Sequence, residues 1–168
     1  MALRTIVTEG DPILRKKCRP VDEVSDRIRM ILDDMVDTMR DAQGVGLAAP
    51  QVGIMRRMFV AEPDPEADPK AVYCFVNPEI LSAEGEEEGE EACLSVPEMY
   101  GRVLRPSRIT IAGLDREGNR QEHAFEGFAA RVMCHEYDHL EGILYSDRAE
   151  QMFRAGEESG EDGEDRNE

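Results

Sequence analysis

Residues 127–139, GFAARVMCHEYDH, form a strong helical pattern. Five of its side chains are spaced so that they fall on neighbouring parts of one helical face: Phe128, Val132, His135, Glu136 and His139. Gly142 follows as a natural stop for such a helix. The pattern therefore predicts a helix that presents apolar side chains and two imidazoles to the same side.

The last five residues of this stretch have the form H-E-x-x-H. His135 and His139 are four residues apart, so on a helix both imidazoles can reach a single divalent metal ion. Glu136 lies beside the first histidine, where its carboxylate can take a proton from a water on the metal. The alternative is a pair of surface histidines on a charged helix. The third histidine, His123, is expected to be an ordinary surface side chain on a strand.

A metal site of this kind needs a third ligand. No histidine follows His139, and most of the acids there belong to a Gly- and acid-rich tail. Upstream, the segment EACLSVP at 91–97 places Cys93 in a short extended stretch bounded by Gly89 and Pro97. A Cys-His-His set with a fourth position left for water is the layout of a catalytic site. Taken alone, Cys93 would be interpreted as a buried free thiol, but beside H-E-x-x-H a ligand role is favoured.

The rest of the chain is predicted to form another amphipathic helix and a series of short strands. From about Ser25, apolar residues recur at steps of three and four, with Asp22 or Ser25 as the cap and Gly44 beyond the end. A hairpin turn is predicted at 115–118. The predicted strands cover residues 58–60, 73–76, 80–83, 103–104, 109–114 and 121–125.

Composition excludes several classes of function. The 168 residues include 20 Lys and Arg against 37 Asp and Glu, so the net charge is −17 and direct binding to nucleic acid is not expected. No run approaches the ~18 apolar residues of a transmembrane helix, and the first residues lack the apolar core of a signal peptide. We therefore expect a cytoplasmic protein without membrane contact, whose four cysteines are thiols or metal ligands.

Three segments, in this order, resemble the signature motifs of the peptide deformylase family: GVGLAAPQ at 44–51, EACLS at 91–95 and HEYDH at 135–139. The segment DPILR at 11–15 is also similar to the opening of that family, and the resemblance extends from about residue 3 to 148. It implies an α+β fold in which antiparallel strands surround a central helix carrying the H-E-x-x-H motif. It also implies an enzyme that removes the formyl group from formylmethionine on nascent polypeptides, and hence a formylated nascent peptide as partner.

The resemblance divides the chain in two. Residues 1–150 would be the deformylase-like catalytic domain. Residues 151–168 are expected to be an acidic, disordered tail, because the chain from Ala155 is rich in Gly, Glu and Asp without apolar spacing. The resemblance makes proximity to the ribosome plausible, yet an acidic tail argues against strong docking on its RNA.

The resemblance assigns the metal to Cys93, His135 and His139. It implies one divalent ion per chain, with Fe(II) as the native metal and Zn, Ni or Co able to occupy the site. Ligand chemistry alone would suggest zinc.

The resemblance also assigns the catalytic groups. A metal-bound hydroxide would attack the formyl carbon, with Glu136 as general base and later as the acid that protonates the leaving amine. Gln51 and the backbone N–H of Leu94 would hydrogen-bond the formyl oxygen as it becomes an oxyanion.

Substrate contacts are predicted from backbone and family position. Gly46 lacks a side chain, so its backbone can pair with an extended peptide laid beside it. The methionine side chain needs an apolar pocket, and the candidates are Val45, Phe128 and Val132, with plain core packing as the alternative. Met99 and Tyr100 are expected at the rim.

Three features around the motifs lead to further expectations. Ala92 stands where the family usually has Gly before the cysteine, so the local backbone must be one that an alanine tolerates. Glu91 and Arg105 occupy the positions of an ion pair behind the metal site, with two exposed charges as the alternative. Cys134 is expected to point away from the metal and to serve packing, because adjacent helix positions differ by ~100°.

Two other interpretations remain open. One is a Cys-His-His metallopeptidase that acts on other amides, and the other is a metal-dependent binding or sensing protein without turnover. Glu136 argues against the second, since binding a metal needs only the ligands whereas activating water needs a base.

Overall fold

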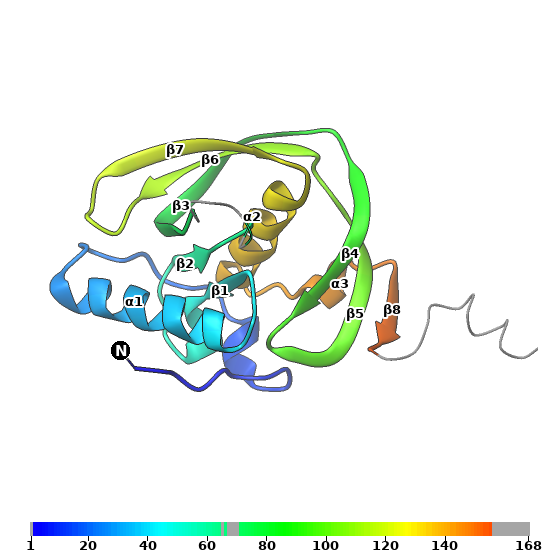
Figure 1. Cartoon of the computed structure of the whole chain (residues 1–168), viewed down its shortest axis with the longest axis horizontal. Coiled ribbons are helices and arrows are strands. Elements are labelled where there is room, and N and C mark those ends of the chain that lie inside the picture. Colours follow the sequence, from blue (N-terminus) through cyan, green and yellow to red (C-terminus); the bar gives the residue numbers. More distant parts are fainter. Residues whose placement is uncertain (1, 65, 67–70, 156–168) are drawn as a thin grey trace, which may run out of the picture.

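The computed structural model describes residues 2–64, 66 and 71–155. Its elements combine two sheets with a small number of helices (Figure 1). In chain order they are η1 (Pro12–Arg15), α1 (Asp26–Asp41), β1 (Gly46–Ala48), η2 (Ala49–Val52), β2 (Met58–Ala61), β3 (Tyr73–Glu84), β4 (Glu87–Cys93), β5 (Val96–Arg105), β6 (Arg108–Leu114), β7 (Arg120–Glu126), α2 (Gly127–Leu140), α3 (Tyr145–Arg148) and β8 (Gln151–Arg154).

The strands form two antiparallel sheets. The larger has the order β1-β2-β3-β6-β7 and the smaller the order β4-β5-β8, and every pairing between these strands is antiparallel. In Figure 1, α2 lies in the middle of the molecule, with β6 and β7 on one side and β4 and β5 on another. The expected α+β class, with antiparallel strands around a central helix, is confirmed.

The outer helix α1 follows the sequence pattern closely. Its cap is Ser25, whose Oγ accepts a hydrogen bond from the backbone N–H of Ile28 at 3.3 Å. The apolar face packs on β1 and β2 and contains fully buried side chains such as Leu32, Met35 and Met39. The helix ends at Asp41, before Gly44, as expected.

The central helix α2 is covered on more than one side, so polar as well as apolar side chains are buried along it. Arg131, His135, Glu136, Asp138 and His139 are each less than a tenth exposed. A buried polar side chain is stable only when it is paired or bound. A functional site is therefore expected among the buried polar side chains of α2.

Strand β3 merges two of the predicted strands. The separation expected around Pro78 appears as register shifts within one strand, between Val76 and Glu79 and again between Ile80 and Ser82. Asn77 has a left-handed backbone with φ of 53°, and its side chain bonds both backbone groups of Val21. The irregularity accommodates the proline without ending the strand.

Strand β8 corrects the expected domain boundary. Gln151–Arg154 pairs with β5, and the Phe153 ring stacks on Tyr100 with 5.1 Å between centroids. These four residues therefore belong to the folded part, although they were assigned to the tail. The remainder of the expected tail, 156–168, lies outside the described residues. Among the helices of the described part, none is long and apolar enough to cross a membrane.

Gly142 provides a test of the packing that ends α2. It has φ of +79°, and a Cβ there would lie 2.6 Å from the backbone oxygen of Arg15. Gly53 is the matched control, because its φ is +82° but nothing lies within 4 Å of the added Cβ. We expect Gly53→Ala to cost about 1 kcal/mol through backbone strain and Gly142→Ala to cost clearly more. Urea unfolding measures both, and equal losses would contradict the packing described.

Candidate metal centre and active site

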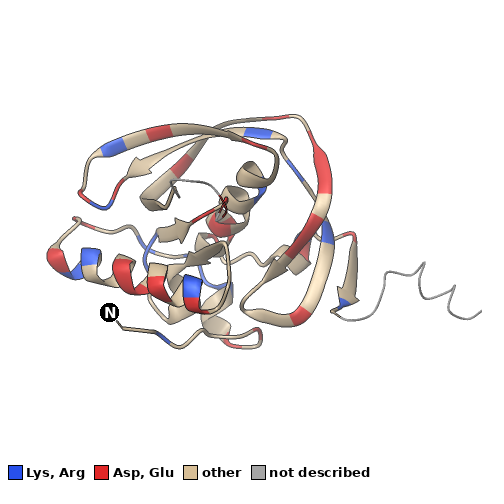
Figure 2. Ribbon diagram, in the orientation of Figure 1, with Lys and Arg blue, Asp and Glu red and all other residues tan. Residues whose placement is uncertain are grey.

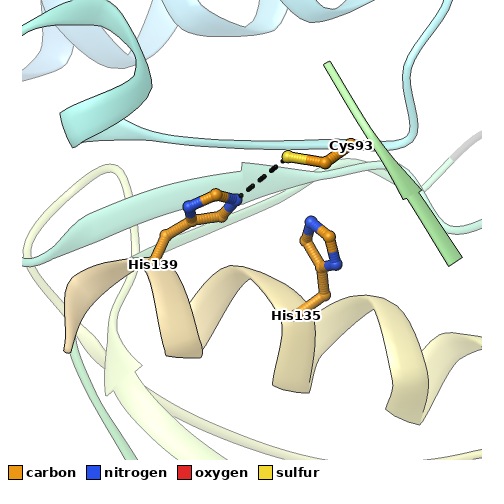
Figure 3. Close-up of side chains that lie close together, drawn as sticks. All are labelled: Cys93, His135 and His139. Atoms are coloured by element: carbon orange, nitrogen blue, oxygen red, sulfur yellow. Dashed lines mark hydrogen bonds between the residues drawn. The ribbon is translucent and has the colours of Figure 1, made fainter. Parts of the chain in front are cut away.

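Three potential ligands meet between β4 and α2. The nearest ligand atoms of Cys93, His135 and His139 all lie within 4.8 Å of one another. Cys93 Sγ is 3.4 Å from His139 Nε2. Figure 3 shows both imidazoles projecting from one side of the helix towards the cysteine above them. The sequence-predicted ligands are thus brought together.

Local structure explains this convergence. The four-residue spacing on α2 sets the two histidine rings side by side, with centroids 5.1 Å apart. On the facing strand, the register shifts between Glu91 and Cys93, and such a bulge re-aims a side chain. Ala92 between them is exposed and has no positive φ, so an alanine is tolerated where glycine was expected.

The three side chains suit a divalent metal. A thiolate and two imidazoles are a donor set typical of catalytic metal sites with one open position. His135 makes a 2.9 Å hydrogen bond between Nδ1 and Glu91 Oε1, which leaves its Nε2 for a metal. Within the described residues, Glu136 Oε1 is buried and lacks a hydrogen-bond partner. A buried carboxylate oxygen without a partner beside three potential ligands fits a site that takes up a metal and its water.

Glu136 is set against the backbone of β1. Its side chain is 4% exposed, and burial raises its pKa to about 7. A Cβ on Gly46 would lie 2.3 Å from Glu136 Oε2, so only glycine allows this close approach. A group with this pKa can both accept and return a proton at neutral pH.

Glu91 is the centre of a buried charge network. Its carboxylate accepts two hydrogen bonds from Arg105, at 2.7 and 2.8 Å, and one from Arg131 at 2.9 Å, besides its contact with His135. Burial opposes ionisation, but the hydrogen bonds from Arg105 and His135 outweigh it and lower the pKa of Glu91 to about 2. The ion pair expected between Glu91 and Arg105 is therefore present and buried.

The network extends to residues that sequence reasoning missed. Asp138 accepts hydrogen bonds from Arg105 at 2.7 Å and from Arg148 at 2.6 Å. Arg131 also donates to two backbone oxygens, and a Cβ on Gly89 would lie 2.9 Å from its guanidinium. An arginine one turn before His135 on a largely apolar helix was the available signal.

The candidate oxyanion donors, Gln51 and Leu94, lie next to Cys93. Gln51 follows β1 and is 1% exposed. Its Oε1 accepts a hydrogen bond from the backbone N–H of Ala48 at 2.9 Å, and its Nε2 lies 3.5 Å from Cys93 Sγ. Nε2 also donates to Ser95 Oγ at 2.9 Å, a partner that sequence reasoning missed although it closes the EACLS segment. Leu94 lies between Cys93 and Ser95 in the sequence.

A cavity of about 640 Å³ opens onto these groups. Its lining includes Glu136, Gln51 and Leu94 together with all four residues predicted to bind substrate: Gly46, Val45, Phe128 and Val132. Val132 is 4% exposed, whereas Phe128 is 55% exposed. Met99 and Tyr100, expected at the rim, also line the cavity.

Cys134 and His123 contribute to packing. Cys134 on α2 is buried in a core cluster, and burial raises the pKa of its thiol to about 11, as expected for a packing residue. His123 is half-buried against the rings of Tyr73 and Phe125, with centroids 5.2 and 5.8 Å away, so the expectation of an ordinary surface side chain was wrong. The residue pattern along its strand did not indicate that His123 would pack among aromatic rings.

A buried Cys-His-His set beside the Glu136 carboxylate, with Cys93, His135 and Glu136 lining a largely apolar cavity, is compatible with a hydrolytic metal centre. Comparison with known proteins is more specific. A family model described as polypeptide deformylase matches residues 3–155. Peptide deformylase 1 of Clostridium perfringens is 48% identical over 147 residues, which are 88% of this chain and 98% of that protein.

Solved structures agree with this comparison. The crystal structure of peptide deformylase from Thermotoga maritima has a TM-score of 0.85 and 39% identity, covering 90% of this chain and 100% of that one. The structure from Ehrlichia chaffeensis in complex with actinonin has a TM-score of 0.85 and 35% identity, covering 90% of this chain and 91% of that one. The chain belongs to the polypeptide deformylase family.

The ligand assignment predicts a contrast between two cysteines. Cys93→Ser should lower the metal bound per chain to about a tenth or less, because a soft thiolate is replaced by a hydroxyl. Cys134→Ser should leave the metal content unchanged, since the Cys134 side chain belongs to the core cluster. Elemental analysis after removal of loose metal measures both. Retention of metal in the first variant, or its loss in the second, would overturn the assignment.

The charge network predicts a pH-dependent stability difference. Because the pKa of Glu91 is lowered in the folded chain, its stabilising effect is present above about pH 4.5 and is lost as the pH falls towards about 2. In metal-free protein, Glu91→Gln should cost about 3 kcal/mol at pH 7, by leaving buried arginines without a countercharge. The difference from wild type should shrink on acidification.

Urea unfolding between pH 7 and pH 3 measures this difference. Glu90→Gln is the matched control, because Glu90 is an exposed neighbour on the same strand and should change stability by less than about 0.5 kcal/mol. A stability gap for Glu91→Gln that stays constant over the pH range would count against the network.

Proposed function

We propose that this chain removes the formyl group from formylmethionine at the start of nascent polypeptides, using one divalent metal held by Cys93, His135 and His139. The observation that carries the proposal is the position of Glu136 beside these ligands and against Gly46, with its buried Oε1 lacking a hydrogen-bond partner among the described residues. Deformylation of nascent peptides is the activity of the family, and the division of labour among residues is our assignment.

The donor set is compatible with several metals. Resemblance to the family favours Fe(II), and Zn, Ni or Co would also accept one thiolate and two imidazoles. When bound, the metal would activate a water molecule and polarise the formyl carbonyl. Glu91 supports metal binding, because its hydrogen bond to His135 Nδ1 leaves Nε2 of that ring directed to the metal position.

Glu136 is assigned the proton transfers. With a pKa of about 7, its carboxylate can take a proton from the attacking water and later give it to the amine that leaves. The balance is simple: one water and one formamide give formate and a free amino group. Oε1 of this carboxylate is buried and has no hydrogen-bond partner among the described residues, so no other donor competes for it there.

Attack on the formamide builds negative charge on the formyl oxygen, so donors must already face it. We assign this role to Gln51 Nε2 and the backbone N–H of Leu94. The hydrogen bond from Ala48 to Gln51 Oε1 supports the assignment, because it turns the nitrogen end of the amide towards Cys93.

The substrate would lie along β1. This strand is at the edge of the five-stranded sheet, so an extended peptide can add beside Gly46 by main-chain pairing, which is insensitive to sequence. The methionine side chain would enter the apolar cavity among Val45, Phe128 and Val132.

Charge limits the partners. Figure 2 shows acidic residues along α1 and along β4, and the whole chain carries −17. Such a surface disfavours docking on ribosomal RNA, so we propose encounter with the nascent peptide itself rather than with nucleic acid. A cytoplasmic location follows from that substrate.

The direct test is formate release from a formyl-Met-Ala peptide under anaerobic conditions. At equal bound metal, Glu136→Gln should lower kcat by a factor of at least about 10² while the metal stays in place. An acetyl-Met-Ala peptide is the control substrate, and little acetate should be released. Equal cleavage of both peptides would favour a general amidohydrolase. No formate from metal-loaded wild type would reduce the chain to a binding or sensing protein with this fold.

A further inference from the structure

We propose that Ser95 is a positioning residue that sets the Gln51 carboxamide for the oxyanion. The inference rests on the function proposed above and extends it to a side chain that would touch neither the metal nor the substrate.

The oxygen end of the amide is fixed by Ala48. Because its backbone N–H donates to Gln51 Oε1 at 2.9 Å, the NH₂ group must point the other way. One of its two N–H bonds goes to Ser95 Oγ at 2.9 Å. Nε2 lies 3.5 Å from Cys93 Sγ, so the second N–H faces the metal side. The serine oxygen therefore determines where the second N–H points.

The backbones of both residues are held by the same N-terminal segment. The N–H of Val7 donates to the carbonyl of Gln51, and the N–H of Glu9 donates to the carbonyl of Ser95, each at 2.7 Å. With both main chains tied down, the side-chain bond spans two fixed points that are 44 residues apart in sequence. Ser95 is 0% exposed, so solvent does not compete for this bond.

Removal of the hydroxyl would leave the amide held by Ala48 and by the longer contact of Nε2 with Cys93 Sγ alone. One buried N–H would lose its acceptor, and the amide plane would be free to turn about its side-chain torsions. The donor would point at the oxyanion for a smaller fraction of the time. The metal ligands and the cavity wall would be unchanged, so the defect should fall on kcat rather than on KM.

The first experiment compares two buried hydroxyls in the metal-loaded full chain. Ser95→Ala should lower kcat for formyl-Met-Ala by about tenfold, with KM within about twofold and full metal content. Thr38→Val is the matched control: Thr38 is 4% exposed on α1, and its Oγ1 accepts one hydrogen bond, from the backbone N–H of Arg4 at 2.9 Å. It should lose stability to a similar degree and keep kcat.

A second variant separates the lost oxygen from altered packing. Ser95→Thr keeps the hydroxyl, so its kcat per metal-loaded chain should lie closer to wild type than to Ser95→Ala. A threonine variant as slow as the alanine variant would overturn the proposal.

A double-mutant cycle tests whether Ser95 acts through Gln51. In a Gln51→Ala background, adding Ser95→Ala should change kcat by less than about twofold, because the group it positions is gone. A further tenfold loss in that background would show a merely structural role. Full kcat in Ser95→Ala alone would remove this inference and leave the proposed function intact. Full kcat in Gln51→Ala would remove the oxyanion role and the inference together.

Discussion

The structure depends on the buried contact between the Glu91 carboxylate and its cationic partners. Arg105 on β5 and Arg131 on α2 both donate to Glu91, and so does the ring of His135. One side chain on β4 thus ties the small sheet to the central helix. Cys93 follows Glu91 by two residues, so the same contact sets the position of the thiolate against the histidines. A half-satisfied network of this kind is less stable than an apolar core, so removal of one member leaves the others buried without their partners.

Two buried carboxylates in one site have opposite environments, and their roles follow from that difference. Glu91 is surrounded by guanidinium groups and stays ionised, with its pKa lowered to about 2. Glu136 forms no ion pair within the described part of the chain, and burial raises its pKa to about 7. The first is suited to holding a ring in place and the second to moving protons. Gly46 adds a steric condition, since it leaves room for the carboxylate of Glu136 at the edge of the sheet.

Local patterns predicted the parts of this molecule whose causes are local. The spacing of α2 predicted a helix with both histidines on one side, and the motif order predicted Cys93 as their partner. Long-range causes were hidden. Strand β4 is an acidic run whose buried member, Glu91, is matched by arginines 14 and 40 residues away. Ser95 carried no signal because its partner lies 44 residues earlier. Strand β8 was missed because it is short, and its pairing partner β5 lies about 50 residues earlier in the sequence.

We propose that one sulfur and two imidazole nitrogens hold a single metal beside Glu136. X-ray absorption at the metal edge measures these ligands, on wild-type chain loaded with one equivalent of Zn or Fe(II) under anaerobic conditions. For Zn, we expect one sulfur at about 2.3 Å and two nitrogens at about 2.0–2.1 Å, with a remaining light ligand from water. A shell without sulfur, or with two sulfurs, would contradict it.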